Sequence, residues 1–280
     1  MENLLFWVKD SPSLIKAIAF FLIWVTLWLP FAAVVGKFIG WGLFQPLNSE
    51  QKLPLVLSLY LIVPLIIWGT LQVEGLTIND YGLNWNLPLL ISIIFGFTLA
   101  VFSLAVIFIS ESLLGWIKWQ QPENYLEVVK TVIIPILGVA IAVGGIEEII
   151  FRGFLYTELQ KDYTNIIAGI ISSVIFALLH LVWEQKETTP QIPGLWLMGM
   201  VLVLARITDH GSIGIAWGLH SGWVWGIICL DTTNAIEYTG QVPEWVTGIG
   251  KKPLAGLNGL MSLLLVAIAL FVVGMRALFV

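Results

Sequence analysis

The sequence has little charge and one cysteine. Only 11% of its 280 residues are charged, whereas a soluble domain has roughly 25% charged residues. The single cysteine, Cys229, excludes an internal disulfide, and the 13 basic residues form no run that would indicate a nucleic-acid partner. With 58% hydrophobic residues and a mean hydropathy of +0.93, the composition instead indicates a polytopic membrane protein in contact with the lipid bilayer.

The N-terminal stretch lacks the basic residues that precede the apolar core of a signal peptide. It reads MENLLFWVKDSPS and carries the acidic residues Glu2 and Asp10. We therefore expect no cleaved signal peptide. The first membrane span should act as an uncleaved anchor.

Long apolar runs predict an all-α membrane bundle of about eight transmembrane helices, because a spanning helix needs about 20 mostly apolar residues. We expect one membrane domain over residues 1–280, without a separate soluble domain or repeat. Basic residues fall almost equally on the two sides, so the positive-inside rule does not decide the orientation. The predicted spans are Leu14–Val35, Leu53–Val73, Leu89–Ile109, Val128–Ile146, Ile166–Trp183, Pro193–Ile207, Ser212–Leu230 and Leu254–Val273.

The stretch GGIEEIIFRGFL, from Gly144 to Leu155, places three ionisable residues at the end of an apolar run. Charged side chains are costly in a bilayer and usually serve a site there. In a helix, Glu148 and Arg152 share a face, whereas Glu147 points about 100° away from Glu148. The spacing predicts that Arg152 anchors Glu148 and leaves Glu147 to do chemistry. A buried ion pair that only locks helix packing is the alternative.

Two of the three histidines, His180 and His220, lie inside predicted spans. A glutamate removed from water, such as Glu147, can accept a proton from a water molecule. One histidine can orient that water, and a second can donate to the oxyanion that forms when water attacks a carbonyl. Together these groups suit hydrolysis of an amide within the membrane.

The same groups leave other interpretations open. Glu147, His180 and His220 could hold a zinc ion, since carboxylate and imidazole both ligate zinc. Buried glutamate and histidine also build transporters and proton relays, although the two halves of the chain show no inverted repeat. A membrane histidine can serve only as an interhelical hydrogen-bonding group. The sequence contains neither HExxH nor GxSxG, so no zincin helix or nucleophile elbow is expected.

Neighbouring polar and aromatic residues are interpreted structurally. Phe176, one helical turn before His180, is predicted to pack in the core. Arg206 is interpreted as a residue that snorkels at a helix end, and Asp209 and His210 as solvated loop residues. The segment Phe154–Lys161 mixes apolar and polar residues and is expected to form a short interfacial helix that returns the chain to the membrane.

At these residues the sequence resembles the CPBP intramembrane proteases, also called the Abi or type II CAAX prenyl protease family. The family signature is EExxxR, then FxxxH, then HxxxN or HxxxD. Here residues 147–152 read EEIIFR and residues 176–180 read FALLH. The third motif begins at His220, but Val224 stands where the family usually has Asn or Asp. The resemblance covers about residues 139–225, which would form the catalytic core.

The resemblance implies an intramembrane endopeptidase that hydrolyses a peptide bond of a membrane-anchored peptide or protein. It implies that Glu147 activates water, that His180 positions it and that His220 stabilises the oxyanion, with Glu148 and Arg152 holding the first motif in shape. No cofactor is expected, with one divalent ion such as zinc as the alternative. The family also includes assembly, bacteriocin-immunity and scaffolding proteins, so a non-catalytic membrane scaffold is the alternative function.

Overall fold

The computed structural model describes residues 10–42, 48–182 and 185–277. Residues 1–9, on which most of the signal-peptide expectation depends, lie outside the described residues. So does Trp183, at the end of the fifth predicted span.

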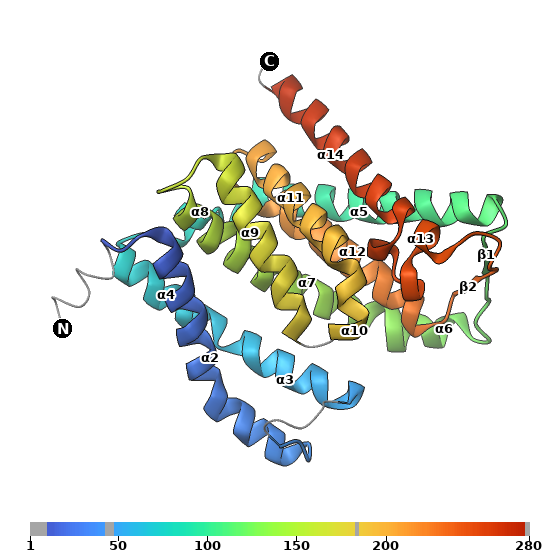
Figure 1. Cartoon of the computed structure of the whole chain (residues 1–280), viewed down its shortest axis with the longest axis horizontal. Helices are drawn as coiled ribbons and strands as arrows, with labels where there is room; N and C mark the ends of the chain where they lie inside the picture. The colour runs from blue at the N-terminus through green and yellow to red at the C-terminus, as the bar shows by residue number, and fades with distance from the viewer. Residues whose placement is uncertain (1–9, 43–47, 183–184, 278–280) are drawn as a thin grey trace.

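The described residues form an almost entirely helical bundle (Figure 1). The longer helices are α2 (Ser13–Phe38), α3 (Ser49–Leu61), α4 (Val63–Glu74), α5 (Leu87–Leu113), α7 (Ile134–Glu148), α9 (Asn165–Leu179), α11 (Ile192–Thr208), α12 (Gly214–Thr232) and α14 (Leu257–Ala277). The short helices are α6 (Tyr125–Val128), α8 (Tyr156–Leu159), α10 (Gln185–Thr188) and α13 (Glu244–Thr247). Two π-helical segments, Val129–Ile133 and Ile149–Leu155, flank α7. Strands β1 (Ile117–Trp119) and β2 (Ile236–Tyr238) pair antiparallel, a small sheet that the sequence does not predict.

Seven helical segments of the described chain are long and apolar enough to cross a membrane. They confirm the predicted all-α polytopic bundle and an integral, multi-pass membrane protein. The remaining predicted span is present as α12, which has 19 residues but is less apolar because it carries glycines, tryptophans and His220. The seven segments are Ser13–Phe38, Gln51–Glu74, Leu87–Leu113, Tyr125–Leu159, Asn165–Val182, Gln185–Thr208 and Leu257–Gly274.

Two predicted segments differ from the structure. The second span is divided at Ile62 into α3 and α4, with Pro64 in the first turn of α4. The expected interfacial helix Phe154–Lys161 is wrong as a separate element, because one continuous helical segment runs from Tyr125 to Leu159. Phe154 and its apolar neighbours are buried in the bundle core instead of lying in the interface.

Helix α12 lies deep in the bundle because small residues let it approach two neighbours closely (Figure 1). A Cβ built on Gly218 would lie 2.1 Å from the carbonyl oxygen of Ile93 in α5. On another face, a Cβ on Gly144 of α7 would lie 2.5 Å from Ser221 Oγ. Such close contacts between small residues are a usual way of packing membrane helices. The glycines of α12 that face α5 are Gly214, Gly218, Gly222 and Gly226.

The substitution Gly218→Ala should displace α12 from α5, because the added methyl group meets backbone atoms that cannot move aside. Overpacking of this kind costs about 1–3 kcal/mol, and we expect a lower Tm in detergent. Gly138→Ala in α7 is the matched control, since a Cβ there meets no atom within 4 Å. Equal Tm values for the two variants would contradict this account of the α5–α12 contact.

A charged cluster fastens the α2–α4 unit to the rest of the bundle. Lys16 Nζ lies 2.8 Å from Glu74 Oε1 and 3.6 Å from Glu158 Oε2. Lys161 Nζ pairs with the same two carboxylates at 2.7 and 2.5 Å. The backbone N–H of Ser13 donates to Asp162, and this hydrogen bond lowers the pKa of the Asp162 carboxyl. The cluster thereby fixes the position of α2 relative to the bundle. It also fixes the position of α3, which packs beside α2.

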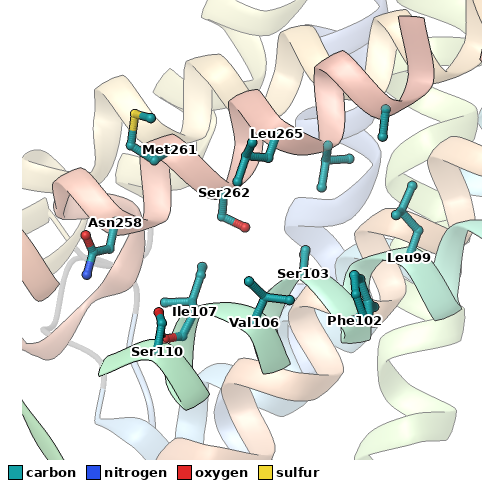
Figure 2. A pocket seen from close by; sticks show the side chains of 12 residues that line it. Leu99, Phe102, Ser103, Val106, Ile107, Ser110, Asn258, Met261, Ser262 and Leu265 are labelled. Carbon is teal, nitrogen blue, oxygen red and sulfur yellow. The ribbon is translucent and has the colours of Figure 1, made fainter. Parts of the chain in front are cut away.

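A cavity of about 280 Å³ lies between α5 and α14 (Figure 2). Apolar side chains from the two helices, such as Val106 and Leu265, face each other across it, and Ser110 and Asn258 lie toward one end. Its lining includes none of the predicted site residues. The candidate functional site is instead at the charged end of α7.

Candidate active site

The ionisable residues at the end of α7 form a buried chain of contacts with α12. Arg152 Nη1 lies 2.9 Å from Glu148 Oε1, and the same oxygen lies 2.8 Å from His220 Nδ1. His220 Nε2 in turn lies 3.6 Å from Glu147 Oε2. All four side chains are more than nine-tenths buried. The ion pair expected from the spacing of Glu148 and Arg152 is present, and Glu147 faces the other ring nitrogen of His220.

Hydrogen bonds orient both imidazoles. The Glu148 carboxylate only accepts, so Nδ1 of His220 carries the hydrogen and Nε2 is left facing Glu147. His180 Nδ1 lies 2.8 Å from the carbonyl oxygen of Phe176, which also only accepts. Nδ1 of His180 therefore donates as well. In both histidines Nε2 is the nitrogen that remains for a substrate or a water molecule.

Phe176 joins the motifs into one cluster. Its ring is fully buried, as expected for core packing, but its neighbours are the groups of the site. The centre of the ring lies 4.6 Å from that of His180, 5.7 Å from that of His220 and 4.6 Å from the guanidinium carbon of Arg152. The structure therefore brings Glu147, Glu148, Arg152 and His220 into polar contact, while His180 reaches them through this aromatic packing.

The backbone after Glu148 is a π-helix, Ile149–Leu155, and not the α-helix that the sequence analysis assumed. Such segments are rare and often occur at functional sites. Every residue of this one is buried. Arg152 Nη2 donates to the Gly199 carbonyl of α11 at 3.1 Å, and Ser172 of α9 donates to the Phe151 carbonyl at 3.0 Å. The π-helix is thus held by both neighbouring helices.

Two interpretations of nearby residues were wrong. Arg206 does not snorkel to the interface. It is 6% exposed and donates to the carbonyls of Gly211 at 3.0 Å and Gly153 at 3.4 Å, because the π-helical segment places a backbone acceptor beside it. Asp209 is not merely solvated, since its carboxylate accepts from the Ile215 backbone N–H at 3.1 Å and holds the start of α12. His210 is exposed, as expected.

The sequence analysis missed Tyr60 of α3, whose hydroxyl donates a hydrogen bond to Glu147 Oε1. Helix α2 holds this tyrosine in place. Trp24 stacks on the Tyr60 ring with centroids 6.2 Å apart, and its Nε1 donates to the Leu59 carbonyl at 2.9 Å. Of the six tyrosines in the chain, Tyr60 is the one inside a predicted span. That position was a signal that could have identified it.

The predicted zinc ligands do not form a ligand set. Within residues 10–42, 48–182 and 185–277, no three His, Cys, Asp or Glu side chains are grouped so that they could hold a metal ion. Glu148 Oε1 is already shared by Arg152 and His220. In this arrangement both carboxylates already accept hydrogen bonds from neighbouring side chains.

Comparison with protein families agrees with this geometry. Residues 129–226 match the family model for the type II CAAX prenyl endopeptidase Rce1-like proteins. This range holds the Glu147–Arg152 stretch, His180 and His220, whereas Tyr60 lies outside it. Searches of curated proteins and of solved structures give no match. Residues 129–226 of this chain are thus similar to the Rce1-like type II CAAX prenyl endopeptidases.

Proposed function

We propose that this protein is an intramembrane endopeptidase in which Glu147 is the base that activates water. The observation that carries the proposal is the buried Glu147 carboxylate, with Tyr60 on one oxygen and His220 Nε2 facing the other. A carboxylate enclosed in this way, within reach of oriented imidazoles, is the group that a general base requires. The match to an endopeptidase family over the same residues supports this function.

Each step of hydrolysis has a residue suited to it. Glu147 takes a proton from water while the water oxygen bonds to the substrate carbonyl carbon. His180 Nε2 accepts a hydrogen bond from that water and orients it. Because Nδ1 of His220 donates to Glu148, His220 would stabilise the oxyanion from Nε2 as the imidazolium, in which both ring nitrogens donate. Collapse of the tetrahedral intermediate breaks the C–N bond, and Glu147 returns its proton to the leaving amine. Positioned acid–base groups of this kind contribute about 10²–10⁴-fold in rate.

Exposure within the cluster indicates the side from which a substrate approaches. Tyr60 and His180 are half-buried, whereas Glu148 and Arg152 are fully buried. A peptide would therefore reach Glu147 from the side of Tyr60 and His180. Glu148 and Arg152 lie on the buried side, where Glu148 accepts from His220 and Arg152 pairs with Glu148. A substrate anchored in the bilayer, presenting an extended tail to this side, fits the arrangement.

The direct test is cleavage of membrane-tethered peptides by the purified protein. A peptide library would be displayed on vesicles with and without an isoprenyl group, and products identified by mass spectrometry. We expect the native protein to cut a subset of peptides and Glu147→Ala to cut none. A folded native protein that cuts no member of the library would refute the proposal and favour the non-catalytic scaffold.

We also expect activity to withstand metal removal. The part of the chain that the structure describes offers no group of three His, Cys, Asp or Glu side chains that could hold a metal, and a catalytic zinc usually takes three protein ligands. Elemental analysis of active protein should show less than one equivalent of zinc, and a chelator should leave turnover unchanged. One equivalent of zinc, with activity lost to a chelator and restored by zinc alone, would make His180, His220 and a glutamate the ligands instead.

A further inference from the structure

The two oxygens of Glu147 have different polar neighbours. Oε1 accepts the Tyr60 hydroxyl, and Oε2 faces His220 Nε2 at 3.6 Å. The role of His220 follows from the proposed mechanism, but that mechanism does not use Tyr60. A phenol is a hydrogen-bond donor that can turn about its C–O bond. It lies on the Glu147 carboxylate, the group that takes the proton of water in the proposed mechanism.

We propose that Tyr60 is a catalytic residue whose hydroxyl donates a hydrogen bond to the oxyanion of the tetrahedral intermediate. This inference rests on the proposed peptidase function and assigns a group that the sequence motifs do not contain. It places one functional residue on α3, far in sequence from the family-matched segment of residues 129–226.

The movement of charge during attack explains how one hydroxyl could serve two acceptors. Before attack, Tyr60 donates to the ionised Glu147 carboxylate. As the water oxygen bonds to the carbonyl carbon, its proton passes to Glu147 and the carbonyl electron pair moves to the carbonyl oxygen. Glu147 loses its negative charge and the substrate oxygen gains one. Because hydrogen bonds to ionised acceptors are about twice as strong, the phenol then prefers the oxyanion and keeps its own proton.

On α12, the polar side chain next to His220 is Ser221, whose hydroxyl has no hydrogen-bond partner in the described structure. Ser221 is buried against Gly144 of α7. Val224 follows His220 by one helical turn on the same face and has an apolar side chain. The oxyanion would therefore have His220 on one side. On the other side it would have the Tyr60 hydroxyl of α3, which contacts Glu147.

The Tyr60 hydroxyl is held in place before any substrate binds. Trp24 stacks on the ring, and the indole nitrogens of Trp24 and Trp28 donate to Leu59 and Ser58 at 2.9 Å each. The end of α3 is thus fixed to α2 by aromatic side chains. Because the ring is fixed, only rotation of the hydroxyl about the C–O bond is needed for the change of acceptor, and donors placed in advance are what makes an oxyanion hole effective.

Tyr60→Phe removes the hydroxyl and keeps the ring and its stacking. We expect kcat to fall by about 10²–10³-fold, as for loss of one oxyanion donor, with KM within about twofold and Tm unchanged. Tyr156→Phe is the matched control, because the Tyr156 hydroxyl is buried without a hydrogen-bond partner in the described structure. That variant should keep native turnover.

A rescue experiment separates a donor from a structural support. In the Tyr60→Phe background, Val224→Asn places an amide donor one turn after His220 and should restore at least about tenfold in kcat, whereas Val224→Leu should restore nothing. Native kcat in Tyr60→Phe, a kcat loss with a lowered Tm, or a loss that Val224→Asn does not restore would each overturn the proposal for Tyr60. Absence of cleavage by the native protein would instead refute the peptidase function itself.

Discussion

Glu147→Gln should abolish peptide hydrolysis while the protein keeps its fold. Glutamine has nearly the same volume, and its carbonyl oxygen can still accept from Tyr60, so the local packing is retained. The amide cannot take a proton from water. We expect kcat to fall by about 10²–10⁴-fold, the contribution of a positioned base. Turnover of a vesicle-tethered peptide measures the loss, and thermal unfolding in detergent measures the fold.

Glu127→Gln is the control for this change. Glu127 lies in the same continuous helical segment, Tyr125–Leu159, but its side chain is exposed. Its substitution should leave both kcat and Tm at native values. If Glu147→Gln retained native turnover, Glu147 could not be the base. If Glu147→Gln lowered Tm as well as turnover, the loss of activity would instead be assigned to impaired packing.

The membrane spans were predictable because bilayer thickness sets the length of an apolar run. The first predicted span, Leu14–Val35, corresponds to α2, and the third, Leu89–Ile109, to α5. The position of α12 inside the bundle was less evident from its apolar residues. Its signal was the glycine at every fourth position, which indicates close contact with another helix.

Local backbone changes were not predictable from the same patterns. The break at Ile62 follows from Pro64, yet proline is also tolerated within packed membrane helices. The π-helix Ile149–Leu155 has the residue composition of an ordinary apolar helix. It is held by Ser172 and Arg206, which bond to its carbonyls from α9 and α11. Tertiary contacts of this kind leave no periodic pattern in the sequence.

The same distinction applies to the site. The Glu148–Arg152 pair is local and follows from helical spacing. The bond from His220 to Glu148 joins residues 72 apart, and that from Tyr60 to Glu147 joins residues 87 apart. A motif resemblance placed His220 near the site, but it does not extend to α3. The place of Tyr60 in an apolar span was a signal in the sequence, but only the fold pairs it with Glu147.

Arg152→Ala should destabilise the protein more than substitution of either glutamate of the candidate site by glutamine. The Arg152 side chain is fully buried and donates to Glu148 and to the Gly199 carbonyl. Its removal leaves the Glu148 carboxylate in the bundle core without its guanidinium. Breaking a buried ion pair by removing one partner costs about 3–5 kcal/mol. A markedly lower Tm, and a lower yield from membranes, should follow.

A double substitution tests whether the unpaired charge is the cause. Adding Glu148→Gln to Arg152→Ala removes the uncompensated carboxylate, so part of the lost stability should return even though two polar contacts are now gone. Lys130→Ala, an exposed cation in the same helical segment, should leave Tm unchanged. If Arg152→Ala unfolded at the native Tm, the guanidinium would not be balancing Glu148. If the double variant were no more stable than Arg152→Ala, the loss would come from the vacated volume beside Phe176 instead of from charge.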